Sequence, residues 1–223
     1  MSSEFTEGVP LTVDSAIGAA SILRELSNSC SEEMGLRELI MNALEALQRV
    51  DPKAGCVYVT KDHQYKNKLA VINIGGEHFS EVKTLNHLNT MGVSGNTTVD
   101  GVQYGDTNKG VGAKIAVLPK QKDGLLYRVI EKGEKIGKEF RLAMFQGIFG
   151  LLAQTDDILG TTLFPYCEDF SPRLKKNGEK YENTATEVVM MGDNLDEDTW
   201  GRMDAKCARR GHSSGTGYAM FKW

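Results

Sequence analysis

Two carboxylates and an amide share one face of a helix that the sequence predicts over residues 32–50. Glu38, Asn42 and Glu45 are separated by four and three residues, and these spacings bring side chains together on an α-helix. A carboxylate can orient and deprotonate a water molecule, and an amide oxygen is a hard ligand that suits Mg²⁺. The pattern predicts metal-assisted attack by water, and the alternative is the solvated face of an ordinary amphipathic helix.

A glycine-rich segment further along the chain favours phosphate binding. Residues 107–114 read Thr-Asn-Lys-Gly-Val-Gly-Ala-Lys and lead into an apolar stretch. Glycines let backbone N–H groups approach phosphate oxygens, and the N-terminus of a helix adds a favourable dipole. The spacing matches neither the Walker A loop nor the dinucleotide fingerprint, and a plain glycine-rich helix start is the alternative. The candidate phosphate contacts are Lys109, Gly110, Val111, Gly112 and Lys114.

Two other polar residues lie close to glycines at the ends of predicted strands. Asn73 precedes Gly75 at the end of an apolar run, and its amide offers both an acceptor and donors to a flat heterocycle. Thr161 follows Gly160 at the start of a late strand, which would place its hydroxyl inside the sheet. Turn formation and strand propensity are the simpler explanations of these residues.

The elements that position these residues are helices grouped early in the chain and strands that mostly follow one another later. Helices are predicted over residues 15–28, 32–50 and 110–118, the last ended by Pro119. This order favours an α+β two-layer sandwich, in which helices cover one face of a mixed, mainly antiparallel sheet. The predicted strands are Cys56–Thr60, Leu69–Ile74, Leu125–Glu131, Phe140–Phe145, Leu159–Pro165 and Glu187–Met191.

Composition excludes several classes of protein. The chain has 223 residues, a net charge of -4 and a sequence pI near 5.7, which argues against a nucleic-acid binder that works by bulk charge. It shows neither a signal peptide nor an apolar run long enough to span a membrane. The four cysteines form no CxxC pair, which favours reduced thiols in the cytoplasm, and the four histidines lack metal-ligand spacing.

Taken in this order, the four motifs resemble the GHKL superfamily of ATPases, which includes DNA gyrase, heat-shock chaperone ATPases, histidine kinases and mismatch-repair proteins. The resemblance covers about residues 15–165 and implies the Bergerat ATP-binding fold. It implies that Glu38 activates water, that Asn42 binds Mg²⁺ and that Glu45 faces the nucleotide. It also implies that Asn73 and Thr161 hold adenine beside the turn at Gly75.

The resemblance also implies an ATP lid over about residues 86–112, with Ser94, Gly95 and Asn96 at its start. Two residues depart from the family pattern, because Asn73 replaces the usual Asp and Glu77 replaces the second glycine of that motif. Since a charged acceptor forms a hydrogen bond roughly twice as strong as a neutral one, an altered nucleotide preference is expected. Residues 1–165 are predicted to form the ATP-binding domain, and residues 166–223 an extension of it that continues into a further domain.

The expected function is Mg²⁺-dependent ATP binding with slow ATP hydrolysis, coupled to closure of the lid and to an ATP-dependent homodimer. A nucleotide-gated interaction module with little hydrolysis is the main alternative, and a protein kinase is a third. The expected partners are ATP and an unidentified protein, without a membrane or direct nucleic-acid contact. The expected location is the cytoplasm, that of the host if the chain is viral.

Overall fold

The computed structural model describes residues 16–51, 55–77, 98–99, 102–103, 112–145, 148–152, 154–155, 162–163, 166–203 and 219–221. The helical elements are α1 (Ala16–Asn28), α2 (Glu32–Gln48), α4 (Gly112–Ala116), the 3₁₀ turn η1 (Leu118–Lys120) and a helical stretch over residues 199–203. The longer strands are β1 (Cys56–Lys61), β2 (Leu69–Ile74), β5 (Leu125–Ile130), β6 (Gly137–Phe145), β7 (Ile148–Leu152) and β13 (Ala185–Met190). The shorter strands are β3 (Thr98–Val99), β4 (Val102–Gln103), β8 (Gln154–Thr155), β9 (Thr162–Leu163), β10 (Tyr166–Cys167), β11 (Lys176–Asn177), β12 (Lys180–Tyr181) and β14 (Ala219–Phe221).

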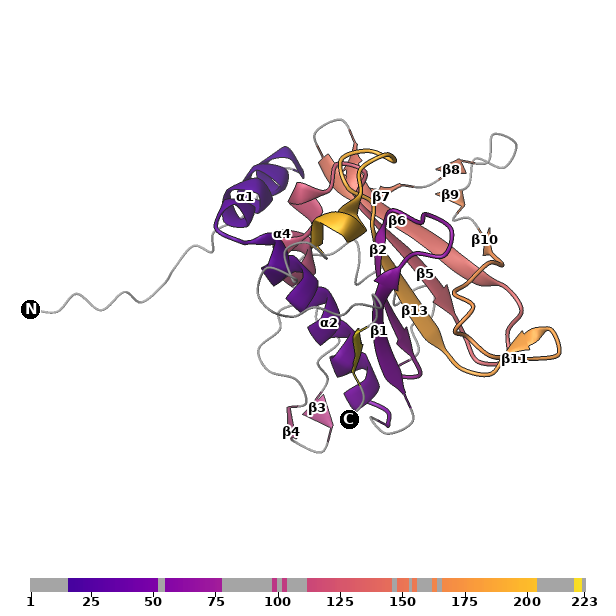
Figure 1. Cartoon of the computed structure of the whole chain (residues 1–223). Helices are drawn as coiled ribbons and strands as arrows, with labels where there is room; N and C mark the ends of the chain where they lie inside the picture. The colour runs from indigo at the N-terminus through magenta and orange to yellow at the C-terminus, as the bar shows by residue number, and fades with distance from the viewer. Residues whose placement is uncertain are drawn as a thin grey trace, which may run out of the picture.

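The main sheet contains eight of the described strands, in the order β10-β6-β5-β13-β2-β1-β14, with β7 also paired to β6. Every strand pair in the described ranges is antiparallel, which fits the predicted α+β class with a mainly antiparallel sheet. Helices α1, α2 and α4 lie together on one side of this sheet (Figure 1). The elements therefore form two layers, with the helices on a single face.

Helix α2 forms where the sequence predicts it, because capping and periodicity agree. The hydroxyl of Ser31 accepts a hydrogen bond from the backbone N–H of Met34 at 3.2 Å, which satisfies one of the free donors of the first turn. Leu39, Ala43 and Leu47 lie on one face of the helix and are buried. The helix ends at Gln48, two residues before its predicted end at residue 50.

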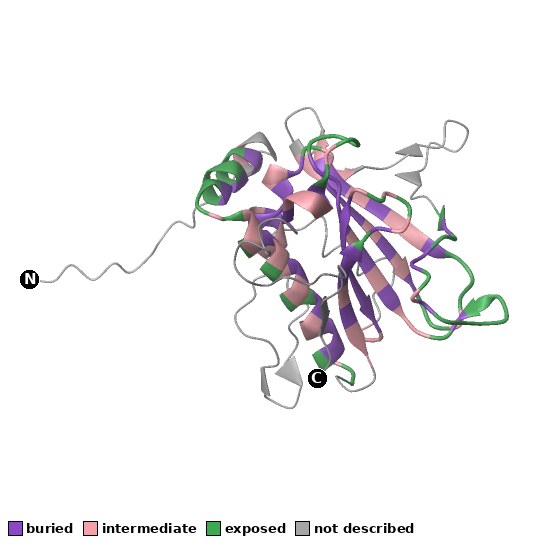
Figure 2. Ribbon diagram, viewed as in Figure 1, coloured by how far each residue is buried: buried purple, intermediate pink, exposed green. Residues whose placement is uncertain are grey.

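Two hydrophobic clusters lie on opposite faces of the sheet. One joins α2 and α4 to side chains of β1 and β2 that include Val57, Leu69 and Val71. The other joins Ala70 and Ile72 of β2 to residues that follow β10 along the chain. Because both faces are covered, all six residues of β2 are buried, and Figure 2 shows the purple buried positions along the central strands.

Strand β13 is a central strand of the sheet although it comes late in the chain. It pairs with β5 on one side and with β2 on the other, so Thr186 lies opposite both Val129 and Asn73. The strand begins two residues before the predicted start at Glu187. Long-range pairing sets this start, and pairing of this kind leaves little trace in local sequence.

Other predicted elements agree with the structure to differing degrees. The strand Leu69–Ile74 has its predicted bounds, whereas β6 begins at Gly137, three residues before the predicted Phe140, because its first residues pair with β10. Of the strand predicted over residues 159–165, only 162–163 are described, and they form β9. None of the helices in the described ranges combines the length and the apolar character needed to cross a bilayer.

Candidate functional site

The glycine segment and the carboxylate helix meet at Glu38 and Gly112. Gly112 is the first residue of α4, and a β-carbon at this position would overlap the carboxylate of Glu38. A larger residue here would displace the flexible end of the Glu38 side chain, so glycine leaves room for this carboxylate beside the start of α4. Glu38 is half-buried. The two motifs predicted to work together are in direct contact.

The other two residues of this helical face differ in their surroundings. Asn42 is exposed, so the alternative of a solvated helix face still describes this residue. The Glu45 side chain is only 12% exposed and lies 3.4 Å from Arg49, which also bonds Glu77 at 3.1 Å. Glu45 is thus held by an ion-pair network at the end of α2. Because Glu38 and Glu45 are both partly buried, a fully solvated helix face does not describe these two residues.

Asn73 lies on the face of β2 that looks toward α2, since Leu69 and Val71 of the same parity pack against that helix. Asn73 is 5% exposed, and its Nδ2 donates to the carbonyl oxygen of Gly75 at 3.1 Å. This bond fixes the orientation of the amide, so Oδ1 is the atom that remains to accept a hydrogen bond from a ligand.

The turn after β2 ties the strand to helix α2. Gly75 and Gly76 have φ values of 84° and 91°, a left-handed conformation that favours glycine. The N–H of Gly75 donates to the carbonyl of Thr184 at 2.7 Å, and the N–H of Glu77 donates to that of Ala46 at 2.7 Å. Asn73 is thereby held beside the last turns of α2.

Sequence reasoning missed Thr186, the cross-strand neighbour of Asn73 on β13. Val188 and Met190, of the same parity, pack toward α2, so the Thr186 hydroxyl lies on the same face as Asn73. The sequence pattern favours Thr161 because it follows Gly160 at the start of a late strand, whereas Thr186 follows Ala185 and lies just before the predicted strand start at Glu187. Thr186 differs from other threonines late in the chain because β13 pairs with β2 and so places Thr186 directly opposite Asn73.

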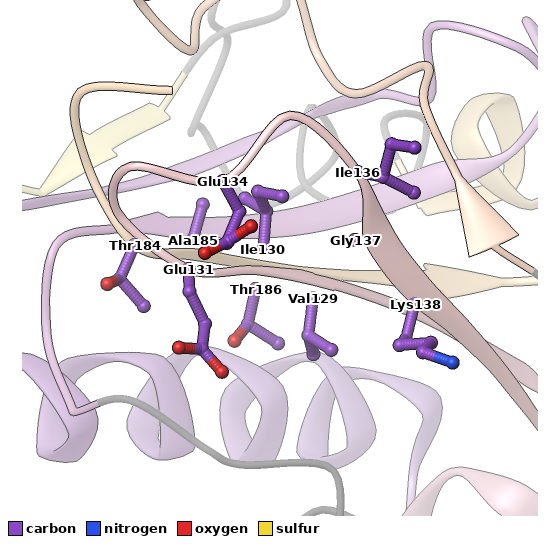
Figure 3. A pocket seen from close by; sticks show the side chains of 10 residues that line it. All are labelled: Val129, Ile130, Glu131, Glu134, Ile136, Gly137, Lys138, Thr184, Ala185 and Thr186. Carbon is purple, nitrogen blue, oxygen red and sulfur yellow. The ribbon is translucent and has the colours of Figure 1, made fainter. Parts of the chain in front are cut away.

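A cavity of about 250 Å³ continues from Thr186 across β13, β5 and β6. Figure 3 shows Val129, Glu131, Thr184 and Thr186 pointing to the same side of the strands, toward helix α2. Sites for whole drug-sized ligands occupy roughly 300–1,000 Å³, so this cavity is smaller than such a site. The lining residues are Val129, Ile130, Glu131, Glu134, Ile136, Gly137, Lys138, Thr184, Ala185 and Thr186.

Lys114 of α4 is 8% exposed, and burial lowers its pKa to about 8. A lysine in this state gains charge readily when an anion approaches, because the anion offsets the cost of burial. Seven predicted site residues lie outside the described ranges, and the predicted lid is described only at β3, β4 and Gly112. The seven are Ser94, Gly95, Asn96, Lys109, Gly110, Val111 and Thr161.

A second polar cluster lies on the opposite face of the sheet. The ligand atoms of Asp62, His63 and Glu187 lie within 4.8 Å of one another, a spacing that suits a metal ion. However, Nη1 of Arg128 donates to Asp62 Oδ1 at 2.6 Å and to Glu187 Oε2 at 3.2 Å, the two oxygens nearest to His63 Nδ1. The guanidinium already occupies the place of a cation, so we assign this cluster a structural role.

The two carboxyl groups of this cluster respond differently to Arg128. Burial alone would raise the pKa of Asp62, but the hydrogen bond and charge of Arg128 outweigh it and hold the pKa below its usual value. Burial raises the pKa of Glu187 despite the bond from the Ser171 N–H and the charges of His63 and Arg128. Burial is thus the dominant influence on Glu187, whereas the fully buried Arg128, with its shorter bond to Asp62, stabilises the Asp62 anion.

Comparisons with known proteins leave the chain without an assigned family. No protein-family model matches the sequence, and a search of curated proteins gave no match.

Proposed function

We propose that the chain binds a nucleoside triphosphate with Mg²⁺ and hydrolyses it slowly, in the manner of the GHKL ATPases that its motifs resemble. The observation that carries this proposal is the contact between Glu38 on α2 and Gly112 at the start of α4. The bond from Glu77 N–H to the Ala46 carbonyl adds support, because it brings the Asn73 turn to the other end of the same helix. The glycine segment and the Asn73 turn thus both contact helix α2, which carries the third motif, and this supports the proposal.

Each residue has a role that its surroundings allow. The amide of Asn42 would hold Mg²⁺, and the ion would neutralise charge on the phosphates. Glu38, half-buried against Gly112, would orient the attacking water and accept its proton. Oδ1 of Asn73 would accept from the base, and Thr186 rather than Thr161 is our preferred hydroxyl beside it, because Thr186 lies directly opposite Asn73.

A nucleotide-gated interaction module with little hydrolysis is the second candidate. The observation that favours it is the neutral amide of Asn73, which forms a weaker hydrogen bond to the base than a carboxylate would. Both versions of the proposal include lid closure, an ATP-dependent homodimer, an unidentified protein partner and a cytoplasmic location.

Removing the Asn42 amide tests the metal site. Replacing Asn42 with alanine should lower ATP affinity in Mg²⁺ to the value measured in EDTA, because Mg²⁺ loses its ligand on the chain. The measurement is titration calorimetry of wild type and variant, with and without Mg²⁺. Gln48→Ala is the matched control, since it removes an exposed amide from the same helix. An Asn42→Ala protein that keeps the full Mg²⁺ effect would contradict the assignment.

The depressed pKa of Lys114 gives a test of the phosphate contact. Below pH 8 the folded protein carries this lysine charged, and above pH 8 it is increasingly neutral. If phosphate binds it, the bound lysine regains its proton, so binding near pH 8.5 takes up protons and affinity falls by up to about tenfold per pH unit above 8. Calorimetry in buffers of different ionisation enthalpy measures this uptake. Proton uptake that persists unchanged in Lys114→Met would rule Lys114 out as its source.

A further inference from the structure

We propose that Arg49 is a positioning residue of the candidate nucleotide site, because its guanidinium joins the carboxylate face of α2 to the turn that holds Asn73. This inference rests on the proposed function and adds a residue that sets nucleotide affinity without taking part in the reaction. Arg49 is the C-cap residue of α2, and its N–H donates to the Glu45 carbonyl at 3.2 Å. It therefore continues the helix by one position, with helical backbone angles.

Arg49 lies on the same face of α2 as the candidate site residues. Four polar residues, separated by four, three and four positions, form one stripe along the helix, since side chains at these spacings are neighbours. They are Glu38, Asn42, Glu45 and Arg49. Arg37, which is exposed on the same helix, lies off this stripe because adjacent residues do not face each other. The stripe thus ends in a cation where α2 ends.

The guanidinium of Arg49 bridges two carboxylates from different segments. Nη2 lies 3.4 Å from Glu45 Oε2 within α2, and Nη1 donates to Glu77 Oε2 at 3.1 Å, just after the turn that follows β2. The Arg49 and Glu77 side chains are only 16% and 24% exposed, so this is not a pair of fully solvated surface charges. The rigid fork of an arginine suits contact with two carboxylates, which the single ammonium of a lysine does not reproduce.

The turn that this bridge reaches is the one that orients Asn73. The N–H of Glu77 donates to a carbonyl of α2 at 2.7 Å, and a β-carbon at Gly76 would lie 2.9 Å from the same oxygen. The turn therefore packs directly against the helix. The carbonyl of Gly75 accepts from Asn73 Nδ2 at 3.1 Å. Because Gly75 is two residues from Glu77, a shift of the turn away from Arg49 would also move the acceptor that holds the Asn73 amide.

A nucleotide bound at this site would contact both segments, so its affinity depends on their separation before binding. A site that is already arranged loses less free energy to ordering when the ligand arrives. Backbone bonds also hold the turn, so the loss of Arg49 should weaken binding without abolishing it. Residues that share one ion-pair network show coupling that corresponds to about a tenfold change in affinity.

The test measures ATP binding by titration calorimetry with Mg²⁺ and ATP hydrolysis by phosphate release. Arg49→Met should bind ATP about tenfold more weakly, because the turn loses its tie to the stripe. Its rate of hydrolysis at saturating ATP should stay within about twofold of wild type, since Glu38 is about 16 Å away along the helix axis. Arg37→Met is the matched control and should leave both values unchanged.

Exchange of the two charges tests the ion pair itself. Arg49→Glu combined with Glu77→Arg places the guanidinium on the turn, again between two carboxylates, and should restore ATP affinity to within about threefold of wild type. Glu77→Arg alone brings two guanidinium groups together and should weaken binding at least as much as Arg49→Met does. Hydrogen exchange without nucleotide provides a further readout, because the Glu77 amide should exchange about tenfold faster in Arg49→Met.

The outcomes separate this inference from the proposed function. An Arg49→Met protein that binds ATP as wild type does would overturn the inference and leave the proposed function intact. The same conclusion would follow if the charge exchange restored nothing, or if the Glu77 amide exchanged at the wild-type rate. Wild-type protein that binds no ATP would instead overturn the proposed function, and this inference with it.

Discussion

Glu38→Gln is expected to lower the rate of ATP hydrolysis by about 10²–10⁴-fold, while ATP affinity stays within about twofold. The amide keeps the shape of the side chain against Gly112 but cannot accept a proton from the attacking water. General-base catalysis contributes an effect of this size, and the loss should appear in kcat rather than in binding. Release of phosphate at saturating ATP and Mg²⁺ measures the rate, and calorimetry measures the affinity.

The control for this variant is Glu25→Gln, which changes an exposed carboxylate on α1. It should hydrolyse ATP at the wild-type rate. Equal rates near zero in wild type and Glu38→Gln, with ATP binding intact, would favour the nucleotide-gated module over the ATPase. A variant that hydrolyses ATP as fast as an active wild type would show that Glu38 is not the general base.

Arg128→Leu is expected to lower the free energy of unfolding by about 3–5 kcal/mol at pH 7. The guanidinium is fully buried between Asp62 and Glu187, which are themselves 1% and 0% exposed, and its loss leaves two buried carboxylates without their cation. Removal of one partner from a buried ion pair has an effect of this size. Urea unfolding, followed by fluorescence or circular dichroism, provides the measurement.

Arg37→Leu is the control, because Arg37 is exposed on α2 and its loss should change the free energy of unfolding by less than about 0.5 kcal/mol.

The pH dependence of the stability of Arg128→Leu provides a second readout. The folded pKa of wild-type Asp62 is lowered, so its stabilising contribution is present above the unfolded pKa and is lost as pH falls through the folded pKa. Without Arg128 the pKa values of both carboxyls should be raised, so both groups are more easily protonated and neutral at pH 5. The loss in free energy of unfolding relative to wild type should therefore be smaller at pH 5 than at pH 7. If this loss in free energy of unfolding were the same at both pH values, the buried charges could not be its cause.

Local sequence was enough to predict the elements whose signals are strong and short-ranged. Helix α2 has a capping serine and an apolar stripe, and β2 is an unbroken apolar run that ends at a glycine turn. The same short-range rules put Glu38, Asn42 and Glu45 on one face of a helix. They also placed Asn73 beside a turn, because glycines with positive φ have a recognisable pattern.

Residues that depend on pairing between distant segments were harder to predict. Thr186 gains its candidate role from the register of β13 with β2, which joins residues more than a hundred positions apart in sequence. The network around Arg128 was also missed, since an arginine inside a predicted strand gives no sign of its buried partners. Such partners are set by register, which local propensity does not determine.

The sequence by itself determined the periodic helices, the apolar strands and the kinds of side chain offered to a ligand, because backbone preference and amphipathic spacing act within a few residues. Only the tertiary structure decided that Glu38 meets Gly112 and that the Asn73 amide donates to the Gly75 carbonyl. Those outcomes depend on close approach of segments far apart in the chain, where steric fit and hydrogen-bond satisfaction select one arrangement.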